Sequence, residues 1–419
     1  SGSTKHPSFF DGFIGHPTQA AAALLTCARI ARTRFYMPPN MVAAILRAAD
    51  PVVTSNGDRL RFESFSADAG VYCRFDVLPG GLDVPPLASG TTNVDFNPPM
   101  REALAGIADS EPLHLQVGQA GNVVVTTLDA RVVERKVPLP ERWIRGFAEV
   151  QVASAEMSPM LELSGSEARR FFRSLPAETR RPLWVVMSGR SARTSGRPVS
   201  GAVCVSGAER LRTLMPLMRF ATGLRAYGPS VDHGTEVAPS AWQVDLQDAT
   251  ITVVVSPEVS RGFSGEGAVL VDLADDVAAS DAAALRPLLD WQAALTPDRL
   301  ATAAGLEVGR VRRALVHLGA AGQIGFDLDA MSFFARQLPF DALVLEQAHP
   351  RLREARALVA ADAVRTRTDG SAVVTSGQVE YRVVLSPEAD RCTCPWWGRH
   401  RGGRGPCKHV LAAHLARVS

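Results

Sequence analysis

Three cysteines and one histidine near the end of the chain have the spacing of a metal site. Cys392 and Cys394 are separated by one residue, and Cys407 and His409 repeat that spacing after a loop of twelve residues. Zn²⁺ prefers four thiolate or imidazole donors at tetrahedral corners, about 2.0–2.3 Å from the metal. Cys-x-Cys sets two thiolates on one side of an extended turn, and Cys-x-His at a helix start brings the second pair across the loop. The spacing predicts that these four residues bind one structural Zn²⁺.

Two other histidines and a disulfide are alternatives to this ligand set. His414 follows His409 by five residues, about 140° around a helix, so we expect its side chain to face away from the site. His400 lies in the loop between the ligand pairs, where a solvated side chain is the simpler interpretation. A disulfide between Cys392 and Cys394 is disfavoured because the two residues are very close in sequence and the expected compartment is reducing.

The residues around the motif predict the elements that hold it. Strands are expected over 363–368, 372–376 and 379–385, with Asp369-Gly370 as a hairpin turn, and an apolar helix is expected after His409. The hairpin, the Cys-x-Cys…Cys-x-His motif and the helix together resemble the ββα-type SWIM zinc finger. That resemblance implies Zn²⁺ as a cofactor.

The segment between and around the ligand pairs is basic and aromatic. Residues 391–419 hold six basic residues and no acidic one, so the rest of the chain has 39 basic and 43 acidic residues out of totals of 45 and 43. Aromatic side chains beside arginines suit base stacking and phosphate contact. The predicted nucleic-acid contacts are Trp396, Trp397, Arg399, Arg401, Arg404 and Lys408. The alternatives are contact with a protein, or a tryptophan packed under the zinc in a loop that the arginines only solubilise.

Residues 281–340 have the pattern of a winged helix-turn-helix. A first helix is expected over 282–291, although Pro287 should kink it. Thr296 and Pro297 are suited to begin a second helix, and Gly305 permits a sharp turn before a third over 308–318. Two short strands, 323–326 and 332–335, would then form the wing.

The resemblance to a winged helix predicts contacts with DNA. In such proteins the second helix of the helix-turn-helix enters the major groove. The predicted contacts are therefore the arginines on the exposed face of 308–318, namely Arg310, Arg312 and Arg313. Nearby acidic residues would repel phosphate, and many winged helices bind proteins instead; these acidic residues are Glu307, Asp327 and Asp329.

The order of a winged helix and a C-terminal SWIM finger is similar to that of bacterial SWIM zinc finger family proteins. This resemblance implies no known catalytic activity. Such proteins are often encoded beside AAA-type ATPases and von Willebrand A-domain proteins, which implies a protein partner of that kind. Only three of the 45 basic residues are lysine, a bias that also suggests a bacterial genome.

Residues 4–278 predict a large α+β domain. Helices are expected over 20–32 and 41–49, followed by short strands that include 59–63 and 71–75. A strand–helix–strand unit then recurs, with helices over 98–108, 167–175 and 208–220. Such units suggest helices laid on antiparallel sheet, as in sliding clamps and helix-grip domains, and an α+β domain without that ancestry is the alternative.

The same region lacks the motifs of common enzymes. Gly189–Gly201 has no Gly-Lys-Ser/Thr for a phosphate-binding loop, and Glu266 stands where the nucleophile elbow requires glycine. Asp272, Asp275 and Asp276 precede a helix, where they are expected to face water. We therefore predict a protein that is not an enzyme and has no small-molecule substrate.

Composition predicts a cytoplasmic protein with no membrane partner. No apolar run reaches the roughly 20 residues that span a bilayer, and 20–25 is too short for an export signal. Six cysteines are too few for a secreted disulfide scaffold. Cys27, Cys73 and Cys204 stand alone in apolar surroundings and are interpreted as small core residues.

Together these patterns predict three parts: an α+β domain over 4–278, a winged helix-turn-helix over 279–342 and a SWIM zinc finger over 343–419. The first functional prediction is nucleic-acid binding, to DNA rather than RNA, through the basic finger with help from the winged helix. The second is an adaptor that docks an AAA-type ATPase or a von Willebrand A-domain protein.

Overall fold

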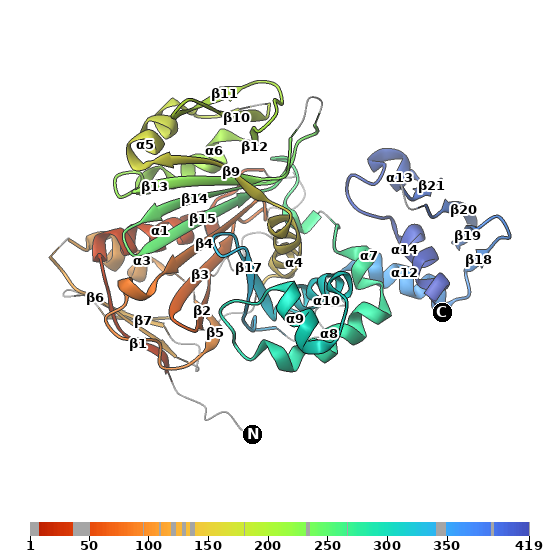
Figure 1. The fold of residues 1–419 in the computed structure, drawn as a ribbon, viewed down its shortest axis with the longest axis horizontal. Coiled ribbons are helices and arrows are strands. Elements are labelled where there is room, and N and C mark those ends of the chain that lie inside the picture. The colour runs from red at the N-terminus through yellow and green to blue at the C-terminus, as the bar shows by residue number, and fades with distance from the viewer. Residues whose placement is uncertain are drawn as a thin grey trace.

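The computed structural model describes residues 8–36, 51–94, 96–108, 110–118, 123–127, 131–134, 139–179, 181–231, 235–265, 267–340, 349–386 and 389–418. The helix expected over 41–49 lies outside these residues. Helices and antiparallel sheets are mixed, in agreement with the α+β prediction (Figure 1). Among the described residues there is no helix with the length and apolar character needed to cross a membrane.

The largest sheet has eight strands, in the order β5-β2-β3-β4-β15-β14-β13-β9. All its neighbours are antiparallel. Gly57 has a φ of 63° in the two-residue turn between β2 and β3, a conformation that glycine adopts without steric cost. The strand bounds are β2 Val52–Asn56, β3 Arg59–Phe65, β4 Val71–Val77, β5 Gly90–Asn93, β9 Ser158–Ser164, β13 Gly223–Gly228, β14 Ser240–Leu246 and β15 Ala249–Val255.

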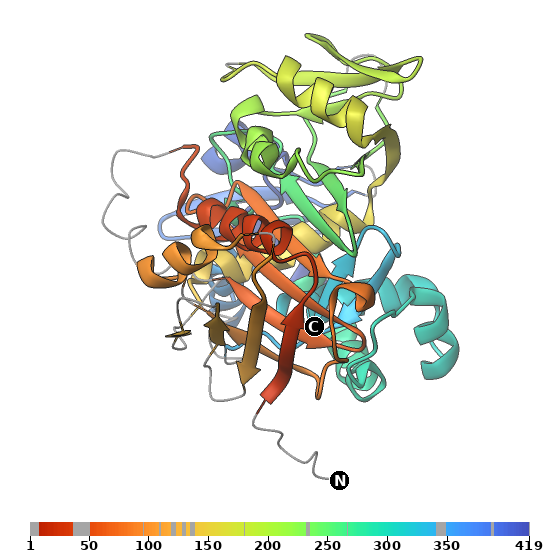
Figure 2. The same cartoon turned by 90° about the vertical axis from the view of Figure 1, so that its left-hand side faces the viewer.

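Alternation along β3 and β4 gives this sheet two different faces. Leu60, Phe62 and Phe75 point to one face, where helix α1 (Pro17–Arg32) covers them (Figure 2). On the other face Phe65 packs against Phe147 of helix α4 (Glu141–Ala155), with ring centroids 5.0 Å apart. Both faces are buried, which explains why the strands contain few exposed residues.

Cys27 of α1 and Cys73 of β4 meet in the first of these cores. They were expected to be separate core residues, but their Sγ atoms lie 3.4 Å apart and both side chains are fully buried. Residues 46 positions apart in sequence give no local sign of such a contact, because the packing of α1 on the sheet creates it.

The expected strand–helix units are present with one difference. Asn97 caps α3 (Pro98–Gly106), and Ser164 and Glu167 form a capping box at α5 (Gly165–Ser174). The third helix was expected over 208–220, but α6 (Ala208–Leu211) gives way to a 3₁₀ turn that contains Pro216, which cannot continue an α-helix. Two smaller sheets complete this part: β1 Ser8–Ile14, β6 Leu113–Gly118, β7 Val123–Thr126 and β8 Arg131–Glu134 form one, and β10 Leu183–Ser188, β11 Ser191–Ser195 and β12 Val203–Val205 form the other.

Three helices and a hairpin follow in the order expected from the sequence. Leu285, Val311 and Leu315 are the centre of their shared core. The first helix begins earlier than expected, at Asp276, because the Asp275 side chain caps it by accepting hydrogen bonds from the Val277 and Ala278 N–H groups. The domain boundary expected between residues 278 and 279 therefore falls inside this helix. The elements are α8 Asp276–Leu289, α9 Pro297–Ala304, α10 Val308–Ala320, β16 Ile324–Asp327 and β17 Ser332–Ala335.

The β16–β17 hairpin is buried against the eight-stranded sheet. Asp327, the last residue of β16, is 2% exposed, whereas the turn residues 329–331 are exposed. Its two carboxylate oxygens lie 3.2 Å from Arg61 Nη2 and 3.1 Å from Arg74 Nη2, on the face of β3 and β4 opposite α1. Arg74 Nη1 also donates to the carbonyl oxygen of Phe326 at 2.6 Å. The hairpin expected as a wing is therefore held by the large domain rather than projecting into solvent.

A second buried pair extends this contact. Arg336, just after β17, pairs with Glu63 of β3, and the Tyr72 hydroxyl donates to the same carboxylate at 2.6 Å. The Arg61 guanidinium stacks over the Phe334 ring, 4.0 Å from its centroid. Burial by itself would raise the pKa of Asp327, but the charges of Arg74 and Arg61 outweigh it and hold that pKa well below its usual range.

Replacement of Asp327 should show how strongly this network joins the two regions. We expect Asp327→Asn to lower the free energy of unfolding by about 3–5 kcal/mol, because it leaves two buried guanidinium charges, those of Arg61 and Arg74, with the single carboxylate of Asp76 between them. The matched control Asp329→Asn removes a half-exposed carboxylate that pairs with Arg225, and should cost no more than about 1 kcal/mol. Urea unfolding followed by tryptophan fluorescence measures both variants. Equal midpoints for the two would show that the network does not hold the hairpin.

Candidate metal centre

The finger is a small sheet followed by two helices. Its strands pair in the order β18-β19-β20-β21, and the last two pair through Cys392, which lies opposite Val383. Helix α12 precedes the sheet, and α13 and α14 follow it (Figure 1). The bounds are α12 Pro350–Ala360, β18 Val364–Thr366, β19 Ser371–Ser376, β20 Val379–Val384, β21 Arg391–Cys392, α13 Pro395–His400 and α14 Lys408–Val418.

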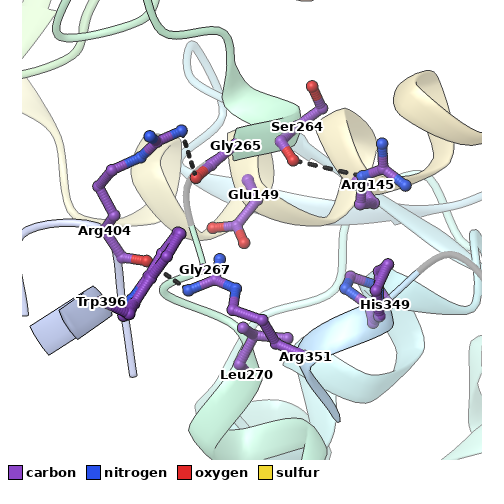
Figure 3. A pocket seen from close by; sticks show the side chains of 11 residues that line it. Arg145, Glu149, Ser264, Gly265, Gly267, Leu270, His349, Arg351, Trp396 and Arg404 are labelled. Carbon is purple, nitrogen blue, oxygen red and sulfur yellow. Dashed lines mark hydrogen bonds between the residues drawn. The ribbon is translucent and has the colours of Figure 1, made fainter. Parts of the chain in front are cut away.

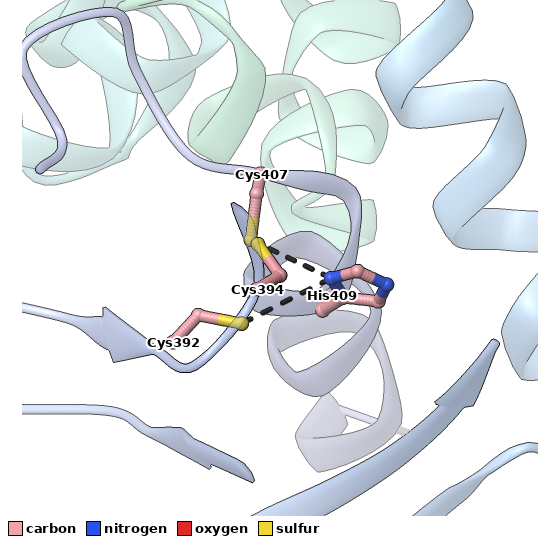
Figure 4. Close-up of side chains that lie close together, drawn as sticks. All are labelled: Cys392, Cys394, Cys407 and His409. Atoms are coloured by element: carbon pink, nitrogen blue, oxygen red, sulfur yellow. Dashed lines mark hydrogen bonds between the residues drawn. The ribbon is translucent and has the colours of Figure 1, made fainter. Parts of the chain in front are cut away.

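Each of the four expected ligands lies at the end of one of these elements. Cys392 ends β21, and Cys394 is the N-cap of α13, where its Sγ accepts a hydrogen bond from the Trp397 N–H at 3.4 Å. Cys407 precedes α14 and its Sγ accepts from the Val410 N–H at 3.5 Å. His409 lies in the first turn of α14. The two short Cys-x-Cys and Cys-x-His segments therefore meet from opposite sides (Figure 4).

The four donor atoms lie at distances that suit one Zn²⁺ ion. All of them are within 4.8 Å of one another, and His409 Nδ1 is 3.9 Å from the Sγ of Cys392 and 4.0 Å from that of Cys407. Thiolates 2.3 Å from a tetrahedral centre are about 3.8 Å apart, so a small contraction brings the set to full coordination. All four side chains are buried, as in closed structural sites. The donor set fits Zn²⁺.

The three thiols affect one another's ionisation because they lie so close together. Hydrogen bonds from Cys392 and His409 lower the pKa of Cys407 to about 4. In return, the hydrogen bond to Cys407 and burial raise the pKa of Cys392, and burial raises that of Cys394. Three thiolates cannot be held this close without a compensating charge, and a divalent metal ion supplies it.

The surroundings of His409 are partly aromatic. The Tyr381 ring stacks on the imidazole with centroids 4.3 Å apart. His409 Nε2 is buried and has no hydrogen-bond partner among the described residues, and the ring borders a cavity of about 390 Å³. Ligating histidines usually donate their second N–H to an acceptor or to water, and this cavity has room for a water molecule.

The alternative ligands lie outside the cluster. His414 Nε2 is 2.7 Å from the Asp390 carboxylate, and His414 is not part of the cluster of donor atoms. His400 packs its ring on Trp396, with centroids 4.3 Å apart, so it is less solvated than expected. The six cysteines are all free thiols in the structure, which agrees with the argument against a disulfide.

The structure separates the predicted nucleic-acid contacts of the finger into two groups. Arg399 and Arg401 are exposed, and Trp397 is half-buried beside Gly402. Arg404 and Trp396 instead face the large domain, where Arg404 Nη2 donates to the carbonyl oxygen of Gly265 at 3.4 Å. Lys408 is half-buried and pairs with Glu354 at 3.0 Å. Only the first group presents its side chains outward.

The predicted arginines of α10 are largely engaged within the protein. Arg310 makes two hydrogen bonds to Asp281, at 2.9 and 2.7 Å, and Arg313 lies 3.5 Å from Asp275. Arg312 is exposed and borders, with Arg313, a groove of about 500 Å³ between α10, α4 and the hairpin. Acidic residues share that groove, namely Glu156, Asp272 and Asp298.

Sequence reasoning missed Arg351 as a residue that positions the finger. Its Nη1 donates to the carbonyl oxygens of Arg404 and Pro406, at 2.6 and 3.0 Å, and its guanidinium lies 4.9 Å from the centroid of the Trp396 ring. Arg351 is one of several arginines near the start of α12. Nothing in its local sequence distinguishes it, because its partners come from a loop more than fifty residues away.

Comparisons with known proteins identify the finger and little else. Residues 381–417, which include all four ligands, match the family model of the SWIM zinc finger, so the finger expected from the motif is confirmed. No curated protein matches the chain. Solved structures that match part of this chain include the PCNA2–PCNA3 complex from Sulfolobus tokodaii, with 7% identity and a TM-score of 0.42 over 60% of this chain and 100% of that one. Another is the Proliferating Cellular Nuclear Antigen of Entamoeba histolytica, with 8% identity and a TM-score of 0.38 over 60% of this chain and 99% of that one. Similarity this low supports no functional inference.

Metal analysis of the purified protein should find one zinc per chain. We expect Cys407→Ser to lose the metal and to make 381–417 sensitive to protease, because structural zinc contributes about 10–16 kcal/mol of apparent binding free energy in small fingers. The matched control is Cys204→Ser, which changes another buried thiol far from the cluster in sequence and should keep its zinc. Full zinc occupancy in Cys407→Ser would contradict the assigned ligand set.

Proposed function

We propose that the protein is a non-enzymatic zinc protein that binds nucleic acid through the outer surface of its finger. The observation that carries this proposal is the exposure of Arg399 and Arg401 at the end of α13. Neither has an ion-pair partner among the described residues, and no acidic residue follows Asp390 in the chain. Unpaired guanidinium groups on a rigid support are suited to phosphate contact.

The metal makes that support rigid. Cys394 is both a ligand and the N-cap of α13, so the helix that carries Arg399 starts at the zinc site. Trp397, on the same helix, is half-buried and adjoins this surface. An aromatic ring next to arginines favours stacking with unpaired bases. Every base has a flat face that can stack in this way. The arrangement supports binding without strong sequence preference.

The helical region contributes less to this proposal than its sequence suggests. Asp281 and Asp275 neutralise Arg310 and Arg313, and the β16–β17 hairpin is buried under the sheet. A winged helix that reads DNA uses its recognition helix, and often its wing, as free surfaces. The proposal therefore places nucleic acid on the finger, with Arg312 as the one of the three arginines predicted in α10 that has no ion-pair partner among the described residues.

Salt dependence tests the role of the two exposed arginines. Binding to duplex DNA is measured as the slope of the logarithm of the binding constant against the logarithm of the salt concentration. We expect Arg399→Ala/Arg401→Ala to make this negative slope shallower by about 1.8, because each phosphate contact contributes roughly 0.9. Trp397→Ala should weaken binding to a single-stranded oligonucleotide more than to a duplex. Fluorescence anisotropy over a series of salt concentrations measures both effects, and zinc content confirms that the finger is intact.

The matched control removes two arginines elsewhere. Arg193 lies in β11 and Arg197 follows that strand; both are exposed and have no ion-pair partner in the described part of the chain. The variant Arg193→Ala/Arg197→Ala should therefore leave the salt slope unchanged. If the finger variant binds both oligonucleotides as the parent does, the nucleic-acid proposal fails. Loss of a protein partner by the same variant in pull-downs, such as an AAA-type ATPase, would then favour the adaptor alternative.

A further inference from the structure

A cavity of about 280 Å³ lies where the finger meets the rest of the protein (Figure 3). Arg145 and Glu149 line it from α4, one helical turn apart. His349 and Arg351 line it from the start of α12, and the finger contributes Arg404 and Trp396. The loop before α7 (Leu270–Leu273) closes another side. Side chains from four segments distant in sequence therefore converge on one space.

The walls of the cavity are in direct contact, so the space has a defined shape. Arg351 Nη1 donates to two carbonyl oxygens of the finger loop, and Arg404 Nη2 donates to that of Gly265. Gly405 approaches Gly267 so closely that a Cβ added to it would lie 2.3 Å from the Gly267 carbonyl oxygen. Glycine at 405 thus permits the finger backbone to pack on the loop before α7.

The lining is strongly basic. Among the described residues, the lining contains the guanidinium groups of Arg145, Arg351 and Arg404 and one carboxylate, that of Glu149, which gives these residues a net charge of +2. The Glu149 carboxylate also accepts a hydrogen bond from the Ala268 N–H at 3.1 Å. Burial, and then the charges of Arg145 and Arg351, lower the pKa of His349 to about 4, so its imidazole is neutral at pH 7. The cavity therefore favours an anion.

Three buried polar atoms of the lining lack hydrogen-bond partners within the described residues. They are His349 Nε2, Trp396 Nε1 and Arg404 Nε. His349 is only 5% exposed. Unsatisfied buried donors of this kind are rare in folded proteins, and each calls for water, an ion or a ligand. Trp396 and Arg404 can only donate through these atoms, and a neutral imidazole can also donate, so the missing group is an acceptor.

We propose that this cavity binds the phosphate group of a small ligand and that the bound phosphate joins the finger to α4 and α12. A phosphate carries about −1.5 to −2 charge at pH 7, which matches the net +2 of the lining better than a single carboxylate does. Its oxygens accept several hydrogen bonds, which suits the guanidinium forks and the unpartnered donors. A cavity of 280 Å³ is larger than one phosphate needs, so there is room for part of an attached group. This site is separate from the outward surface of Arg399 and Arg401.

Isothermal titration of the zinc-loaded full chain tests the proposal with inorganic phosphate, ADP and ATP as probes in chloride buffer. We expect saturable binding, and we expect Arg145→Gln to weaken it at least about tenfold, because a charge-assisted hydrogen bond is lost. The matched control is Arg353→Gln, an exposed arginine of α12 outside the cavity, which should bind as the parent does. His349→Gln, which removes the imidazole without changing net charge at pH 7, should also weaken binding.

The probes identify the source of the phosphate and separate this proposal from the previous one. Tighter binding of ADP or ATP than of phosphate would identify a nucleotide, and equal binding would identify the free anion. Absence of binding for all three probes, or equal binding by Arg145→Gln and Arg353→Gln at parental zinc content, would overturn the proposal. Because Arg399→Ala/Arg401→Ala should leave phosphate binding unchanged, failure of nucleic-acid binding would leave this site standing.

Discussion

The position of one buried carboxylate, Asp327, governs how the parts of this protein meet. It lies between two guanidinium groups of the eight-stranded sheet, and so binds the β16–β17 hairpin to the large domain. The hairpin follows α10 directly, and α10 is thereby held against α4. Buried charges are tolerated only with close partners of opposite sign, which makes this geometry specific. The segment of α8, α9, α10 and the hairpin, which the sequence predicted as a separate winged helix, is here packed into a larger body.

The second constraint is the metal cluster. Its three thiols and the imidazole share a small buried space, and a divalent cation compensates the charge of the thiolates. Coordination then fixes α13 and α14 relative to the small sheet. This orientation decides which basic residues face outward, as Arg399 and Arg401 do, and which face inward, as Arg404 does. One zinc ion therefore orients two surfaces that face in different directions.

The finger packs on its neighbours through an apolar cluster between α14 and α7, and its inward surface adds a polar junction beside that cluster. Backbone carbonyls of the finger loop accept hydrogen bonds from Arg351 and Arg261. Glycines allow the two loops to approach, and the remaining space is lined with positive charge. Like charges in close proximity oppose packing, so an anion at this junction would strengthen the contact between finger and core. The stability of the contact between the finger and the rest of the chain would then depend on the bound anion.

The zinc ligands could be identified from the sequence because their chemistry depends on spacing over a few residues. The same holds for the caps of α5 and α9, which Ser164 and Thr296 supply locally. By contrast, Arg404 and Arg399 are indistinguishable in a basic loop, and only the packing of the finger shows that one is turned toward the core. The burial of Asp327 and the meeting of Cys27 with Cys73 were equally hidden, because their partners are brought by distant strands and helices. Contacts between residues far apart in the chain depend on how complete elements pack, and no local pattern contains that information.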